Sequence, residues 1–204
     1  ALAQFRLGLM YVSGRDGFPQ SYSKAAVWYR RAADGGSADA QCNLGVMYED
    51  GQGVDQDYVE AAKLYLRASM QNHAGAQNNL GLMYELGRGV RQDYAEARRW
   101  FRKSAVQGQV WGQYNLARIY YNGDGVPVNY AEADHWFHKA AEQNLGLAQY
   151  IIARDYYNGY GMALGKKGHT LALKYLEKFT DQFRQPDGKI VVENADMKAV
   201  MSDA

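Results

Sequence analysis

The chain of 204 residues carries 23 lysines and arginines against 22 aspartates and glutamates, so its net charge is close to zero. Because its basic residues are also dispersed along the sequence, this balance predicts neither nucleic-acid binding nor attraction to an anionic membrane surface. The single cysteine, Cys42, excludes an internal disulfide. No run reaches the roughly eighteen apolar residues of a membrane-spanning helix, so membrane insertion is not expected.

One sequence motif recurs about every thirty-six residues along the chain. Its form is Leu-Gly-x-x-Tyr-x-x-Gly-x-Gly-Val, which begins at Leu44 and again at Leu80; variants begin at Leu7, Leu116 and Ile152. A unit of this length cannot bury its apolar face alone and stacks on its neighbours, so the period predicts a solenoid. Solenoids mainly present surface to partners, which favours a binding function.

Each repeat is predicted to contain two helices. In the second copy the first helix is expected over Ala38–Glu49, and Gly51 ends it because glycine readily adopts the left-handed conformation. Asp57 then caps the start of the second helix, and Asn129 repeats this position in the fourth copy.

Small and aromatic residues recur at fixed places in these helices. The small residues, which let helix axes approach closely, are Gly45, Gly81, Ala61 and Ala97. The tryptophans Trp28, Trp100 and Trp136 are interpreted as core residues that fill the space between units.

The two ends of the chain depart from the pattern. The sequence starts at Ala1 without an initiator methionine, which indicates that it was cut from something longer or processed. A three-residue insertion is expected around Ala163–His169, before a helix that holds Leu173 and Tyr175. Residues 184–204 are interpreted as a segment that caps the last repeat, with a docking tail or a fragment of further structure as alternatives.

The segment Ala76–Val106 follows the string Ala-x-x-x-Leu-Gly-x-x-Tyr-x-x-Gly-x-Gly-Val-x-x-Asp-Tyr-x-x-Ala-x-x-Trp. This string resembles the Sel-one-like repeat, a relative of the tetratricopeptide repeat. The resemblance implies an all-α, right-handed superhelical solenoid of antiparallel helix pairs that acts as an adaptor or scaffold. One solenoid domain is expected over 1–183, with repeats at 3–37, 38–74, 75–110, 111–146 and 147–183.

The resemblance also implies that the first helix of each pair lines a concave groove. If each Leu-Gly pair is taken as positions seven and eight, then positions two, five, nine and twelve face that groove. The late copies place aromatic and arginine residues there: Trp111, Tyr114, Arg118 and Tyr121, then Tyr150, Arg154 and Tyr157. The earlier copies offer the carboxylates Asp39, Glu49 and Glu85.

Tyrosine, tryptophan and arginine are enriched among interface hot spots, so the late positions are candidates for partner binding. Arg118 and Arg154 share one register, which would set two guanidiniums on neighbouring helices and suit a partner with acidic groups. As an alternative, Tyr121 and Tyr157 are solvent-tolerant residues at helix ends, and Arg118 pairs with a neighbouring carboxylate.

No set of residues predicts catalysis, a metal site or a cofactor. His135 and His138 with Glu132 form one carboxylate–histidine motif, but a metal site in a helical bundle draws ligands from several helices, so a solvated outer face is favoured. Cys42 has no activating partner in its repeat, and Asp39 opposes thiolate formation, so an inert buried thiol is expected.

The sequence therefore predicts a non-enzymatic scaffold of bacterial type that binds a partner protein or peptide in its concave groove. One alternative is an immunity protein that neutralises a secreted bacterial effector, and another is a weak hydrolase or small-ligand binder. Export or a periplasmic location is favoured over the cytoplasm, from the family resemblance and the missing start. The oligomeric state is left open.

Overall fold

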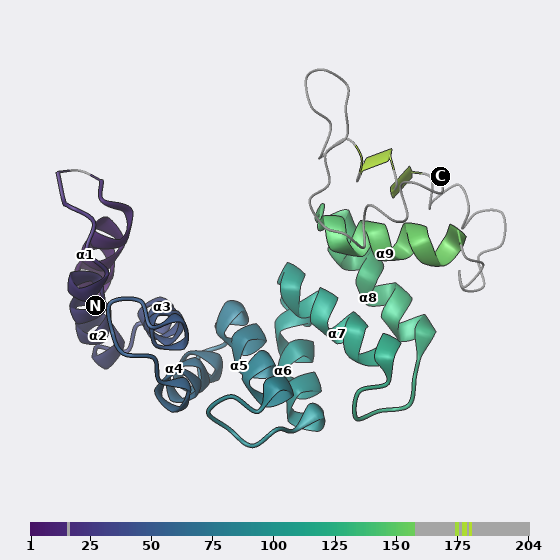
Figure 1. Ribbon diagram of the computed structural model, residues 1–204, viewed down its shortest axis with the longest axis horizontal. Coiled ribbons are helices and arrows are strands. Elements are labelled where there is room, and N and C mark those ends of the chain that lie inside the picture. The colour runs from purple at the N-terminus through teal and green to yellow at the C-terminus, as the bar shows by residue number, and fades with distance from the viewer. Residues whose placement is uncertain (16, 158–173, 176, 179, 181–204) are drawn as a thin grey trace. The chain divides into compact units, whose positions relative to one another are not determined.

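A computed structural model of the chain describes residues 1–15, 17–157, 174–175, 177–178 and 180 (Figure 1). Within these residues it contains helices and no strand. The helices are α1 Leu2–Ser13, α2 Tyr22–Asp34, α3 Ala38–Asp50, α4 Tyr58–Met70, α5 Ala74–Leu86, α6 Tyr94–Val106, α7 Val110–Asn122, α8 Tyr130–Glu142 and α9 Gly146–Tyr157. The predicted all-α solenoid of helix pairs is confirmed.

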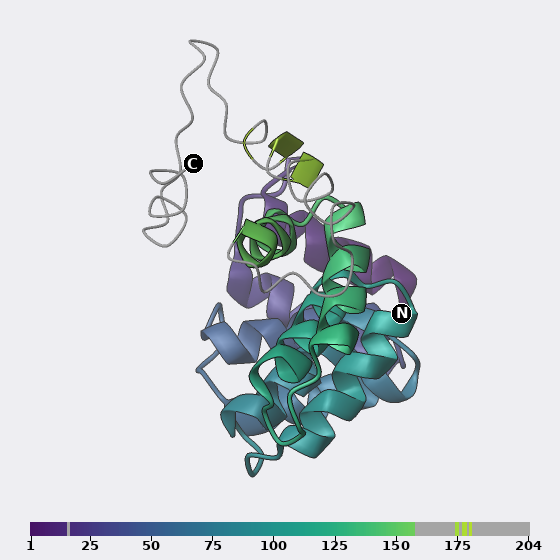
Figure 2. The same ribbon diagram turned by 90° about the vertical axis from the view of Figure 1, so that its right-hand side faces the viewer.

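The chain divides into two compact units, Ala1–Gly112 and Gln113–Ala204. The first holds α1 to α6 and the start of α7, and the second holds the rest of α7 with α8 and α9. Figures 1 and 2 show α3 beside α4 and α5 beside α6, and α4 packs against α5 to join the two pairs. The predicted insertion around Ala163–His169 and the predicted capping segment 184–204 lie outside the described residues; Tyr175 is described and has helical backbone.

The helices begin and end at the capping residues that the sequence predicts. The Asp57 carboxylate accepts hydrogen bonds from the backbone N–H groups of Val59 and Glu60, at 2.9 and 3.0 Å, which satisfies donors that have no partner within the helix. Gly51 ends α3 with φ 69°. This helix extends one residue beyond the predicted Glu49, to Asp50.

Close packing between the two helices of a pair depends on glycine. A Cβ on Gly45 would lie 2.7 Å from the ring of Tyr65, and a Cβ on Gly81 would lie 2.6 Å from the ring of Phe101. Both aromatic rings are fully buried. The predicted small-residue positions therefore let an aromatic side chain of the second helix lie directly on the backbone of the first.

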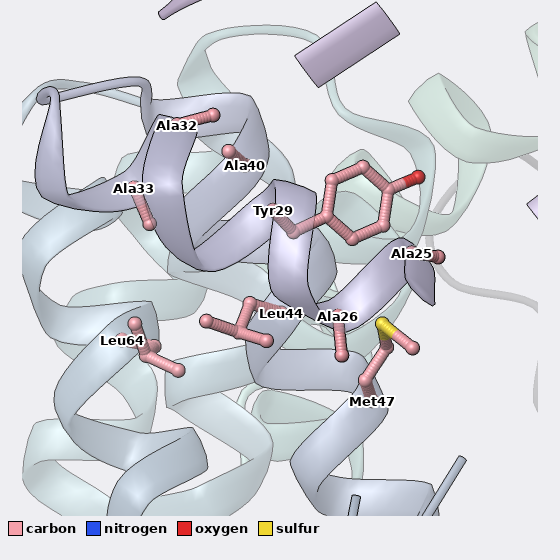
Figure 3. Packing of buried hydrophobic residues seen from close by; sticks show 9 residues of the cluster. All are labelled: Ala25, Ala26, Tyr29, Ala32, Ala33, Ala40, Leu44, Met47 and Leu64. Atoms are coloured by element: carbon pink, nitrogen blue, oxygen red, sulfur yellow. The ribbon is translucent and has the colours of Figure 1, made fainter. Parts of the chain in front are cut away.

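One hydrophobic cluster of the first unit is built from alanines and a few large side chains, as Figure 3 shows. Its members are Ala25, Ala26, Tyr29, Ala32 and Ala33 of α2, Ala40, Leu44 and Met47 of α3, and Leu64 of α4. Of the predicted core tryptophans, Trp100 and Trp136 are buried, whereas Trp28 is half-buried with the Arg31 guanidinium 4.8 Å from its ring centroid.

Pairs of glutamines, which we call the glutamine ladder, link the ends of second helices to the starts of first helices. The ladder bonds run from Gln71 Nε2 to Gln41 Oε1 at 2.8 Å, from Gln107 to Gln77 at 2.7 Å, and from Gln143 to Gln113 at 2.8 Å. The accepting glutamines are buried. Because a buried amide without a partner is costly, these bonds favour one register between helices.

Candidate partner-binding site

Helices α7 and α9 carry most of the residues that the sequence predicts for partner binding. α7 carries Tyr114, Arg118 and Tyr121, and α9 carries Tyr150 and Arg154. Spacings of three or four residues place side chains on one face of a helix, so each set forms a stripe. All five residues lie in the second compact unit.

The two tyrosines of α7 pack on aromatic residues of α8. The ring centroids of Tyr114 and Tyr121 lie 5.8 and 6.0 Å from that of Phe137. Tyr121 also meets the ring of Tyr130 at 5.5 Å, edge to face. Phe137 is itself buried, so these contacts hold both tyrosines in place. Side chains that are already held lose less entropy when a partner binds.

Arg154, Asp155 and Tyr121 form a hydrogen-bonded triad. Arg154 donates to Asp155 Oδ1 from Nε at 3.0 Å and from Nη2 at 2.8 Å, and Nη2 also donates to the Tyr121 hydroxyl at 3.0 Å. The Tyr121 hydroxyl donates to Asp155 Oδ1 at 3.3 Å. The Asp155 side chain is 14% exposed and that of Arg154 is 32% exposed. The carboxylate of Asp155 therefore neutralises much of the Arg154 charge.

The pKa shifts of the triad follow from burial and charge. Burial lowers the pKa of Arg154, but the hydrogen bonds and negative charge of Asp155 outweigh it and raise that pKa overall. Burial raises the pKa of Tyr121, and the charge of Asp155 raises it further. Arg154 is therefore a fixed cation, and Tyr121 keeps its proton.

Arg118 and Arg154 both act on the hydroxyl of Tyr114. Burial raises the pKa of Tyr114, and the positive charges of these two arginines oppose that rise. The positive charges of two arginines thus act on one phenol, and Asp155 pairs with Arg154. We call Tyr114, Arg118, Tyr121, Arg154 and Asp155 the α7–α9 cluster.

The remaining predicted partner-binding residues of α7 and α9 differ in how much surface they offer to a partner. Tyr150 is only 8% exposed and offers little area to a partner, although its hydroxyl is close enough to raise the pKa of Arg154. Trp111, near the start of α7, is 44% exposed and belongs to the first unit. Tyr157 is the last residue of α9, and its side chain lies outside the described part of the structure.

The early carboxylates lie on two helices, Asp39 and Glu49 on α3 and Glu85 on α5. Asp39 lies in the first turn of α3 and Glu49 in its last turn, about 15 Å apart along the helix axis. Asp39 Oδ1 lies 3.3 Å from His73 Nε2, whereas Glu49 accepts a hydrogen bond from the Tyr65 hydroxyl at 2.8 Å. Glu85, on α5, is 6% exposed. The Asp39 side chain is 66% exposed and that of Glu49 is 24% exposed, so Asp39 keeps the most surface for a partner.

Asp155 is the member of the cluster that sequence reasoning missed. It directly follows Arg154, but the same position in the preceding copy is Ile119. A comparison of the repeats therefore gives no indication that a carboxylate belongs beside the second arginine.

The histidines of α8 occupy different surroundings. His135 is exposed, whereas the side chain of His138 is 18% exposed and its Nδ1 lies 3.1 Å from Asp134 Oδ1. The ring of His138 also packs edge to face against Tyr175, with centroids 5.6 Å apart. Among the described residues, no group of three or more His, Cys, Asp or Glu side chains could hold a metal ion.

His138 should make the stability of the second unit depend on pH. Burial lowers its pKa, but the hydrogen bonds and charge of Asp134 outweigh burial and raise the pKa above 6.5. A raised pKa means that protonated His138 stabilises the fold below about pH 6.5 and that this contribution is lost as pH rises through the folded pKa. NMR titration of the ring protons measures that pKa directly.

The matched control for this titration is the exposed His135. His138→Gln should flatten the fall in unfolding free energy between about pH 6 and 8, while His135→Gln should leave it in place. A His138 pKa below 6.5 would contradict the assignment.

The repeats belong to a recognised family of helical solenoids. The Sel1 repeat matches residues 1–37, 38–73, 74–109, 112–145 and 146–182, so the chain belongs to the Sel1 repeat family. No curated protein matches it significantly.

Solved structures show the same fold. A Sel1 repeat protein from Oxalobacter formigenes is 28% identical, with a TM-score of 0.80 over 98% of this chain and 83% of that one. A protective antigen of uropathogenic Escherichia coli that displays the Sel1-like repeat fold is 30% identical, with a TM-score of 0.51 over 96% of this chain and 51% of that one. A Sel1 repeat protein from Klebsiella pneumoniae, 23% identical, reaches 0.56 over 87% and 85%.

The Sel1 repeat fold supports a protein-interaction scaffold, and proteins of this family are generally non-enzymatic. In the described part of the chain, no helix has both the length and the apolar character needed to cross a membrane. The repeat fold thus points to protein partners.

Proposed function

We propose that the chain is a non-enzymatic scaffold that holds a partner protein or peptide on the α7–α9 cluster. The observation that carries this proposal is that the charges of two arginines, Arg118 and Arg154, both act on the hydroxyl of Tyr114. The cluster therefore carries positive charge from two neighbouring first helices. A carboxylate of the partner is the group that this charge recognises best.

Rigid positioning supports the same function. The Arg154–Asp155–Tyr121 bonds and the packing of Tyr114 on Phe137 hold the cluster before any partner arrives. Binding then orders few further side chains, and tyrosine and arginine contribute large contact areas with polar tips.

Arg118 and Asp155 should affect binding in opposite directions. Arg118→Ala removes one of the two cations and should weaken the partner's affinity by about tenfold or more. Asp155→Asn removes the carboxylate that competes for Arg154, so it should strengthen binding to an acidic partner several-fold. The partner is first captured on the immobilised chain from an extract of the source organism, and its Kd for each variant is then measured by calorimetry.

Arg15→Ala is the matched control, because it removes an exposed arginine from a loop of the first unit. It should leave the Kd within about twofold of wild type. Equal affinities for wild type, Arg118→Ala and Asp155→Asn, all folded by circular dichroism, would move the site away from the α7–α9 cluster. Arg154→Ala is avoided because it would leave the half-buried Asp155 unpaired and lower stability as well.

The identity of the captured protein also decides between the two binding roles that the sequence raises. A secreted effector whose activity falls when the chain binds would make this scaffold an immunity protein. A partner without such activity leaves the general adaptor role.

A further inference from the structure

The second helices of the first unit are strongly basic, although the chain as a whole is neutral. The cations of α2, α4 and α6 are Lys24, Arg30, Arg31, Lys63, Arg67, Arg98, Arg99, Arg102 and Lys103. Their carboxylates are Asp34, Glu60 and Glu96. The first helices α3 and α5 carry no lysine or arginine. The basic residues that look dispersed in the sequence are therefore gathered by the fold onto one layer of helices.

We call the exposed side of α2, α4 and α6 the basic face. All of its cations are exposed except Arg98, which is half-buried. The repeat brings them into register, because Arg31, Arg67 and Lys103 occupy one position and Lys63 and Arg99 another. Residues at the same position of successive repeats form a row across neighbouring repeats of a solenoid.

Part of this charge has a local structural explanation. Arg31, Arg67 and Lys103 lie in the last turns of their helices, where a cation interacts favourably with the helix dipole. Lys63 and Arg99 each form an ion pair with a carboxylate three residues earlier in the same helix, Glu60 at 3.1 Å and Glu96 at 2.6 Å. These helices still carry more cations than carboxylates, so the basic face keeps an excess of positive charge.

Several cations of the basic face are held in defined positions. Lys103 Nζ lies 4.0 Å from the ring centroid of Trp100, and Arg67 Nη2 donates to the carbonyl of Ala33 at 3.0 Å. Arg99 Nη1 lies 2.6 Å from Glu96 Oε1. These contacts restrain the positive groups while the three residues stay exposed, so part of the ordering cost of binding is already met.

Apolar side chains are interleaved with these cations. Met70 is 76% exposed, Val106 66% and Leu66 39%. Leu66 takes the register position of Arg102, and Met70 that of Val106. A mixture of arginine, methionine and aliphatic residues is typical of protein interfaces, where apolar contacts at the centre are bordered by charged groups.

We propose that the basic face binds an acidic protein segment, in which aspartate or glutamate alternates with apolar residues. Carboxylates would pair with the arginines and lysines, and apolar side chains would cover Leu66, Met70 and Val106. Single-stranded nucleic acid suits the part of this face on α6 less well, because bases need exposed aromatic rings for stacking and Trp100 is buried beneath Lys103. A lipid surface suits it less well, because a membrane-bound helix needs a continuous exposed apolar face.

This proposal does not rest on the α7–α9 cluster, which lies in the other unit. The probe is a labelled random copolymer of glutamate and tyrosine, compared with polyglutamate, mixed-sequence DNA and vesicles of equimolar phosphatidylcholine and phosphatidylserine. The test variant is Lys63→Gln/Arg99→Gln/Arg102→Gln. The control is Arg6→Gln/Arg15→Gln/Lys139→Gln, which changes the net charge equally outside the basic face.

The copolymer should bind wild type more tightly than the other three probes. The test variant should weaken this binding by about tenfold or more, and the control by less than about twofold, because only the former removes charges at the contact. Binding should also fall as salt rises. Equal losses in the two variants, or tighter binding of DNA or vesicles than of the copolymer, would overturn the proposal.

Discussion

Gly89→Ala should strongly destabilise the first unit. Gly89 has φ +67°, and a Cβ there would lie 2.0 Å from the carbonyl oxygen of Tyr58 and 2.7 Å from the backbone N of Val59. These are backbone atoms in the first turn of α4, so they cannot rotate away. The left-handed conformation and the clash together should cost at least about 3 kcal/mol of unfolding free energy.

Gly108→Ala is the control that separates the cost of the left-handed backbone conformation from the cost of the steric clash. Gly108 has φ +84°, but a Cβ there would meet nothing within 4 Å. Asn72 and Asn144 occupy the same place in other repeats with φ 62° and 65°, which shows that this turn accepts a side chain. The control should therefore cost only about 1 kcal/mol, for the backbone conformation alone.

Urea denaturation followed by circular dichroism measures both losses. The account requires Gly89→Ala to lose clearly more stability than Gly108→Ala. Equal losses would mean that the loop after α5 moves freely away from α4, and that contact between repeats does not depend on this glycine.

Cys42 should react about a thousandfold more slowly with iodoacetamide in the folded protein than in the unfolded chain, because only the thiolate attacks. Burial, and to a lesser degree the charge of Asp39, raises the pKa of its thiol from 9.0 to about 12. The side chain is 7% exposed, which also blocks the reagent. The expected buried thiol is confirmed.

The measurement follows alkylation by mass spectrometry at about pH 8, with and without denaturant, where an ordinary thiol is partly ionised. Asp39→Asn should change the folded rate only slightly, because burial is the larger cause of the shift. A folded rate close to the unfolded rate would show that α3 opens readily or that the thiol is activated.

The repeated elements of the fold could be predicted from sequence because their causes are local. Gly51 adopts the left-handed conformation that ends α3, and Asp57 caps α4 with its own carboxylate. Packing between helices was less predictable. Gly81 is part of the sequence motif, but the motif does not show that the ring of Phe101 packs on it. The glutamines of the ladder recur at fixed intervals in the sequence. Their hydrogen bonds join residues about thirty positions apart on different helices, and the periodicity within one helix does not predict such bonds.

The candidate site was less predictable, because its chemistry depends on single copies rather than on the repeat. The register of Arg118 and Arg154 is visible in the sequence, and both act on Tyr114. Asp155 occurs in one copy only, and its bonds to Arg154 change the charge of the site. The basic face could not be predicted for a different reason. The net charge of the chain is close to zero, and only the fold shows that the cations gather on the second helices of the first unit.

Hydrogen–deuterium exchange on the chain with and without its captured partner tests the central claim most directly, because it needs no substitution. If the partner binds the α7–α9 cluster, exchange should slow in α7 and α9 around Arg118 and Arg154, and exchange in α3 should not change. Protection confined to α3 and α5, or equal protection along every helix, would contradict a binding site on the α7–α9 cluster.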